Sequence, residues 1–179
     1  VEPRKNLDRL LDAWSELAPS FGADFELVVA GPAGWASEAT LARLGAAQPG
    51  LRYLGYVAES DLPALTAGAS VFAYPSLYEG FGFPIAQAIA AGVPVVASNV
   101  SSMPEVAGPG GILVDPRSVG EIRGALSQLL TSPSLRQRLA AAGREHSKRF
   151  RWEECARRSL DFFRRIASGK PGTEYSFPI

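Results

Sequence analysis

The chain has 179 residues, of which 46% are hydrophobic and 20% are charged, and this composition is typical of one globular domain with a substantial core. Its 18 basic and 18 acidic residues give a formal net charge of zero, so we expect no general attraction to nucleic acid. The apolar runs are all shorter than the about 18 residues that a transmembrane helix needs.

The single cysteine, Cys155, excludes an internal disulfide and suits a reducing compartment. No signal peptide is recognisable, so we expect a cytoplasmic protein. The chain begins with Val1 rather than methionine, and we interpret it as a fragment of a longer protein.

Hydrophobic periodicity and turn residues predict alternating helices and strands. In chain order we expect a helix at 7–18, capped by Asn6 or Asp8, a strand at 25–31, a helix at 36–47, a strand at 51–57, a helix at 58–69, a strand at 70–76, a helix at 85–91 and strands at 93–99 and 110–116. Helices at 118–131, 132–150 and 151–167 follow, and 169–179 reads as an irregular tail. The continuous β-rich run at 25–31, which ends in Gly31, indicates a strand that is buried on both faces.

This alternation predicts an α/β fold with a Rossmann-like, doubly wound parallel sheet. Ligands of such sheets bind beyond the carboxyl ends of the strands. Polar or glycine-rich turns follow the first three predicted strands, and we expect these turns to lie on one edge of the sheet.

The turn after the third strand, "YEGFGFP", carries the clearest chemical signal. Gly80 and Gly82 allow close backbone approach, and the N–H groups at the start of the next helix form a favourable anion site. A carboxylate at Glu79 suits hydroxyl groups beside that anion, and Gln87 lies within the same helix. A ligand with a phosphate group between two groups of hydroxyls would fit this arrangement, and a nucleotide-sugar is such a ligand. The structural alternative is that Glu79 caps the helix and Gln87 is a satisfied, half-buried amide.

Residues 75–108, "PSLYEGFGFPIAQAIAAGVPVVASNVSSMPEVAG", resemble the donor-site signature of glycosyltransferase family 4, the retaining enzymes of GT-B fold. "VEPRKNL" resembles the phosphate-binding segment of that family, and "LRYLGYVAESDLPAL" resembles its base-contacting strand and loop. The resemblance covers nearly the whole chain and is greatest to bacterial mannosyltransferase-like members. It implies the C-terminal half of a GT-B enzyme, with residues 1–168 as the donor-binding domain.

The resemblance also implies roles for individual residues. Lys5 and Glu79 take the catalytic roles, Lys5 at the donor diphosphate and Glu79 at the donor sugar. The implied donor-binding residues are Arg4, Lys5, Tyr56, Val57, Glu59, Glu79, Gly80, Phe81, Gly82, Phe83 and Gln87. Gln87 stands where the family has a second glutamate, so the charge-assisted bond to the ribose is lost.

The implied reaction is transfer of a hexosyl unit without metal or cofactor. GDP-mannose is the donor that this branch suggests, while UDP- and ADP-sugars stay open. A glycan or lipid-linked acceptor would bind through an N-terminal domain outside this chain. The strand expected before Val1, central to the sheet, would come from preceding residues or from a partner chain, or else the sheet end is exposed. Helix 151–168 would cross to that domain, and we expect the chain alone to be inactive.

Three further features have competing interpretations. The basic residues between Arg144 and Arg165 favour a solvated helix face, with attachment to the inner membrane face as the alternative. We expect His146 to be a surface residue without catalytic duty and Cys155 to be buried core. A non-catalytic nucleotide-binding module, or a sugar epimerase or phosphorylase, are the alternative functions on this scaffold.

Overall fold

The computed structural model describes residues 2–35, 38–46 and 48–168, and the irregular tail expected at 169–179 lies outside these residues. Its strands pair in parallel, as the alternation of helices and strands predicted, and they form two sheets. In one sheet, β1 (Leu27–Ala30) pairs with β2 (Leu51–Gly55). In the other, the order is β3 (Phe72–Tyr74), β4 (Val95–Ser98), β5 (Gly111–Val114). All strands expected from the sequence are therefore present.

The helices follow the predicted order. They are α1 (Leu7–Phe21), α2 (Glu38–Gly45), α3 (Leu62–Ala67), α4 (Phe83–Ala91), α5 (Met103–Ala107), α6 (Val119–Thr131), α7 (Pro133–Ser147) and α8 (Trp152–Ala167), with the 3-10 turns η1 (Pro3–Lys5) and η2 (Gly108–Gly110). The sequence did not predict α5, because five residues are too few to show a helical period. None of the described helices has the length and hydropathy to cross a bilayer.

One hydrophobic cluster joins the two sheets. Side chains of α1 and α6 pack on a single face that includes residues of both sheets, such as Val29 of β1 and Val96 of β4. A second cluster, built from α4 and α5, covers the other face of the sheet of β3, β4 and β5 only. The site described below therefore lies on the sheet that is covered on both faces.

The prediction that β1 is buried on both faces is wrong. Its residues alternate between half-buried and exposed, and Val28 is 39% exposed. The apolar run is explained by one covered face, where Leu27 and Val29 join the core. Within the described residues no helix of the second cluster reaches the opposite face of β1.

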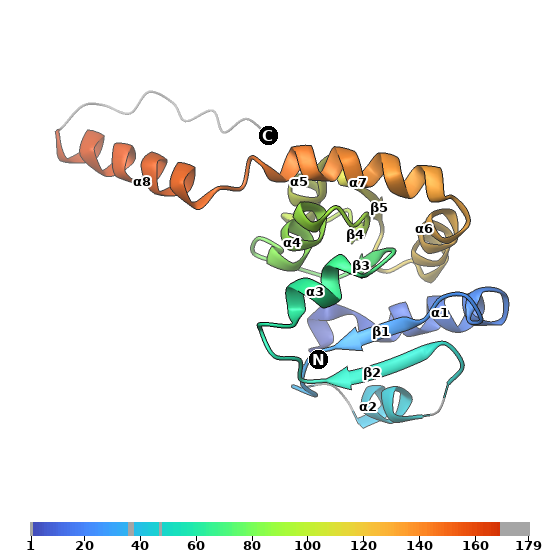
Figure 1. Ribbon diagram of the computed structural model, residues 1–179. Helices are drawn as coiled ribbons and strands as arrows, with labels where there is room; N and C mark the ends of the chain where they lie inside the picture. The colour runs from blue at the N-terminus through green and yellow to red at the C-terminus, as the bar shows by residue number, and fades with distance from the viewer. Residues whose placement is uncertain (1, 36–37, 47, 169–179) are drawn as a thin grey trace.

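The single sheet expected from the sequence is divided between β1 and β3. Each of these two strands has one hydrogen-bonded neighbour, β2 and β4 respectively, so their facing edges are unpaired among the described residues. Figure 1 shows the two sheets as separate groups, with α1 beside β1. That a strand outside the chain completes the sheet stays a prediction.

Helix α8 extends away from the rest of the molecule, as the red and orange ribbon in Figure 1 shows. None of its residues is buried. Cys155 is exposed, so the expectation of a core cysteine is wrong. Its apolar neighbours on the same helix face, including Phe163 and Ile166, are exposed as well. Trp152, at the start of α8, stacks on Phe83 of α4 and is itself 73% exposed.

Candidate functional site

The loop between β3 and α4 carries Glu79 into a buried position, where the residue is only 8% exposed. Two serines at the start of α5 hold the backbone of this loop. The hydroxyl of Ser101 donates to the Glu79 carbonyl oxygen. The hydroxyl of Ser102 reaches both the Glu79 and the Phe81 carbonyl oxygens, at 3.1 and 2.9 Å. Three segments that are distant in sequence thus meet at Glu79: η1, β3 with the loop that follows it, and the residues that lead into α5.

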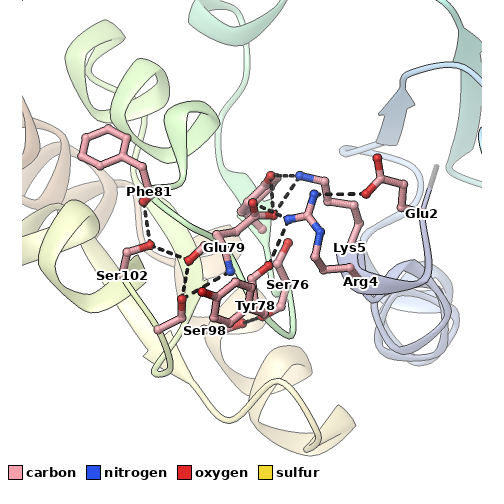
Figure 2. Close-up of polar contacts among 11 residues, drawn as sticks. Glu2, Arg4, Lys5, Ser76, Tyr78, Glu79, Phe81, Ser98 and Ser102 are labelled. Atoms are coloured by element: carbon pink, nitrogen blue, oxygen red, sulfur yellow. Dashed lines mark hydrogen bonds and ion pairs between the residues drawn. The ribbon is translucent and has the colours of Figure 1, made fainter.

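The Glu79 carboxylate is surrounded by three donors. Lys5 Nζ and the Tyr74 hydroxyl each lie 2.8 Å from Oε1 and donate to it, while the Arg4 guanidinium forms an ion pair with Oε2. Lys5 also donates to the Tyr74 hydroxyl oxygen. Figure 2 shows Arg4 and Lys5 approaching Glu79 from the same side, where η1 meets the β3–α4 loop. We call Arg4, Lys5, Tyr74 and Glu79 the charge cluster.

The surroundings set the protonation states of the charge cluster. Burial acts to raise the pKa of Glu79, but hydrogen bonds from Lys5, Arg4 and Tyr74 outweigh it and hold the pKa below its ordinary value. Burial raises the pKa of Tyr74, against the opposing effect of Lys5, so its hydroxyl keeps its proton. For Lys5, burial alone would lower the pKa, but its hydrogen bonds to Glu79 and Tyr74 produce a net increase. At neutral pH the cluster therefore holds a carboxylate, an ammonium, a guanidinium and a neutral phenol.

The start of the chain is fastened to the β3–α4 loop by further contacts. Arg4 Nη1 donates to the Tyr78 carbonyl at 3.0 Å, and the Arg4 carbonyl accepts from the Leu77 N–H at 2.9 Å. Asn6 sits at the cap position of α1, but its side chain makes no cap bond. Its amide instead donates to the carbonyl oxygens of Pro75 and Pro116, at 2.8 and 2.6 Å. These contacts place Lys5 where it can reach Glu79.

The glycine-rich turn leads directly into α4. Gly82 is the cap residue, with a φ of 95° that favours glycine, and no side chain caps the helix. A Cβ at Gly80 would meet no atom within 4 Å. The turn therefore leaves open space above Gly80 beside an uncapped helix start, a geometry that can accept an anionic group through backbone N–H donors.

Aromatic side chains flank this turn. Phe81 packs edge-on against Phe150 at 5.4 Å between ring centroids. Phe83 is exposed at the first position of α4 and stacks on Trp152 at 6.1 Å. Both phenylalanines thus tie the turn to the segment that joins α7 to α8.

The other residues expected at the site lie apart from the charge cluster. Tyr56, Val57 and Glu59 occupy the loop after β2, and Tyr56 is 73% exposed. Gln87 is exposed on α4 rather than half-buried. In the part of the chain that the structure describes, no hydrogen bond or ion pair joins these four side chains to Glu79, so their roles stay predictions.

His146, which the sequence predicted to be a surface residue without catalytic duty, makes contacts that hold two helices together. It is half-buried, its Nε2 lies 2.8 Å from the Glu105 carbonyl oxygen, and its ring packs edge-on against Phe150. These contacts join α7 to α5. Residues 2–35, 38–46 and 48–168 contain no group of three or more His, Cys, Asp or Glu placed to hold a metal ion.

Known proteins resemble the chain in sequence and in fold. The family model described as "Glycosyl transferases group 1" matches residues 1–146. The chain is 41% identical over 166 residues to the O-antigen chain mannosyltransferase B of Escherichia coli, which covers 92% of this chain and 44% of that protein. It is 33% identical over 172 residues to a GDP-mannose-dependent alpha-(1-6)-phosphatidylinositol monomannoside mannosyltransferase of Mycobacterium tuberculosis, covering 90% and 45%.

Among solved structures, the C-terminal domain of a glycosyl transferase group 1 family protein (LpcC) from Francisella tularensis superposes with a TM-score of 0.71 at 22% identity. The match covers 83% of this chain and 80% of that domain, so it shows a shared fold. The chain spans less than half the length of the curated relatives named above. Because the family model spans most of the chain, the chain belongs to the glycosyl transferases group 1 and has the α/β domain of the GT-B type.

Proposed function

We propose that the chain is the C-terminal, donor-binding half of a retaining glycosyltransferase of family 4. The full protein would transfer a mannosyl unit from GDP-mannose to a glycan or lipid-linked acceptor. The observation that carries this proposal is the buried Glu79 carboxylate, held by Lys5 and Arg4 beside an uncapped helix start. The two mannosyltransferase relatives support the choice of sugar, and the dependence of the second on GDP-mannose supports the choice of nucleotide.

Two groups of atoms would share the binding of the donor. Lys5 and the backbone N–H groups at the start of α4 would take the diphosphate, and Glu79 would accept from hydroxyls of the sugar. In the reaction, the bond between the anomeric carbon and the diphosphate oxygen would break, the acceptor hydroxyl oxygen would bond to that carbon, and the hydroxyl proton would pass to the departing diphosphate. Positive potential from Lys5 and the helix start would stabilise the negative charge on the departing nucleoside diphosphate.

Further parts of the proposal concern the whole protein. An N-terminal domain would carry the acceptor site, and α8 would cross to it, so that this chain alone is inactive. We place the enzyme in the cytoplasm, and the excess of basic residues from Arg144 onward supports contact with the inner membrane face. Tyr56, Val57 and Glu59 would contact the nucleobase, and Gln87 the ribose.

A non-catalytic nucleotide-binding module is the second candidate. It is favoured by Gln87, which is exposed and uncharged where the family has a glutamate. Such a module would keep the nucleotide contact but lose selectivity for the attached sugar.

Thermal unfolding of the chain with GDP, UDP, ADP, GDP-mannose and UDP-glucose tests the proposal. A ligand at 100 times its dissociation constant adds about 2.7 kcal/mol of stability, which is readily measured. We expect GDP-mannose to raise the melting temperature most, and Glu79→Gln to reduce that shift while leaving the shift by GDP. Glu16→Gln, which removes an exposed carboxylate paired with Arg123, is the matched control. Equal shifts by GDP and GDP-mannose in both variants would favour the non-catalytic module, and no shift by any nucleotide would contradict donor binding by this chain.

A further inference from the structure

Tyr74, the last residue of β3, contacts both charged groups on which the proposed function depends. Its hydroxyl donates to Glu79 Oε1 at 2.8 Å and accepts from Lys5. Its ring lies under the Lys5 ammonium, with Nζ 4.8 Å from the ring centroid, and stacks with Phe72 at 6.0 Å. Neither the motif nor its spacing in the sequence had singled out this tyrosine.

The two donors to Glu79 Oε1 differ in what else they can bind. Lys5 is a cation, so the diphosphate of a nucleotide-sugar would compete with Glu79 for it. The Tyr74 phenol is neutral, since its pKa is raised by burial, and it therefore has no comparable attraction to phosphate. Arg4 is held on Oε2 and on the Tyr78 carbonyl, which leaves Lys5 as the donor most easily drawn away.

We propose that Tyr74 is a positioning residue, whose hydroxyl keeps the Glu79 carboxylate oriented toward the donor sugar when the diphosphate draws Lys5 away. The inference rests on the proposed function. A carboxylate oxygen accepts more than one hydrogen bond, so departure of Lys5 frees one acceptor direction on Oε1 for a sugar hydroxyl. With Tyr74 still donating, the freed direction is fixed in space rather than averaged over rotations of the side chain.

Tyr74→Phe tests this inference, because it removes the hydroxyl and keeps the ring with its packing on Phe72 and Lys5. We expect affinity for GDP-mannose to fall about tenfold, the size of one hydrogen bond to a charged group, with affinity for GDP changed less than twofold. Tyr53→Phe is the matched control, since its hydroxyl donates only to the Gly31 carbonyl, at 3.0 Å. Calorimetric titration of each variant with both ligands supplies the numbers.

A purely structural tyrosine would give a different result. Loss of GDP and GDP-mannose affinity by the same factor, together with a lower melting temperature, would overturn the inference, as would no loss of either.

The ionisation of Glu79 provides a readout without ligand. Nuclear magnetic resonance titration of its carboxyl carbon should show a higher pKa in Tyr74→Phe than in the wild type, because a hydrogen bond that stabilises the charged form is lost.

This second readout separates the two proposals. If the wild type binds no nucleotide, the proposed function fails, while the pKa of Glu79 still decides whether Tyr74 holds the carboxylate. If GDP-mannose binds but Tyr74→Phe leaves the pKa of Glu79 unchanged, the positioning role fails and the proposed function stands.

Discussion

Glu79 combines burial with charge, and burial of a carboxylate is costly unless hydrogen bonds and opposite charges compensate for it. Here both carboxylate oxygens have cationic partners, and Tyr74 adds a neutral donor. The consequence is a carboxylate that is held in one orientation before any ligand arrives. A site of this kind avoids part of the entropy that ordering a free side chain would cost on binding.

The two glycines of the turn should respond differently to the same substitution. We expect Gly82→Ala to destabilise the fold by about 1–2 kcal/mol, because its φ of 95° is strained for a residue with a side chain. Gly80→Ala should leave the free energy of unfolding nearly unchanged, since the added methyl meets no atom within 4 Å. The same methyl would occupy the open space above the turn, so GDP-mannose affinity should fall.

Urea unfolding and calorimetric titration of both variants measure these effects. Unchanged donor affinity in Gly80→Ala would show that the ligand does not approach this turn. A stable Gly82→Ala would show that the backbone can relax to a negative φ.

At the residue scale, the sequence revealed the part of the site that lies in contiguous motifs. Lys5 and Glu79 were both predicted, and the structure brings them into contact. Tyr74, Ser101 and Ser102 were missed, although the last two fall within the quoted 75–108 segment. A hydroxyl carries little information in a sequence, because its function depends on which distant segment folds against it.

At the scale of the element, the apolar periodicity of α8 predicted the helix correctly but did not show which surface covers its apolar face. Its apolar residues recur at helical spacing, and the helix forms as predicted. The expectation of a buried Cys155 failed because periodicity identifies an apolar face but not the surface that covers it. The burial of β1 was overestimated for the same reason.

Removal of α8 should therefore have little effect on the domain. A chain that ends at residue 151 should lose less than about 1 kcal/mol of unfolding free energy, since α8 buries no residue and its aromatic contact to the body is Trp152 on Phe83. A chain that ends at residue 132 also lacks α7, whose Leu135 and Leu139 pack against the core, and should be strongly destabilised. Chemical denaturation of the two truncated chains provides the comparison; a large loss in the first would mean that α8 folds back onto the domain.

At the scale of the molecule, the two sheets differ in how well they are covered. Every residue of β4 is buried, and β4 has a hydrogen-bonded neighbour on each side. Strands β1 and β2 share one covered face and leave an edge unpaired among the described residues. The sequence predicted all five strands but not this division, because local patterns do not say which strands are neighbours.

Amide hydrogen exchange rates should differ between the two sheets. We expect the amides of β4 to exchange slowest, at a rate set by global unfolding, and those of β1 and β2 to exchange faster through local opening. Measurement by nuclear magnetic resonance or mass spectrometry gives the protection of each strand. Equal protection in both sheets would indicate that the shared core of α1 and α6 makes the molecule one cooperative unit.

The hydrogen bonds of the Asn6 side-chain amide affect the order of folding events. It bonds to the carbonyl of Pro116, 110 positions further along the chain, as well as to that of Pro75. Asn6 leaves the ribosome before Pro116, so its bond to Pro116 must wait until β5 and its following loop have emerged. Contacts between such distant residues also form slowly, because a long loop must close before they do. Lys5 lies next to Asn6, so its contact with Glu79 gains the support of the Pro116 bond only after the residues that follow β5 have been synthesised.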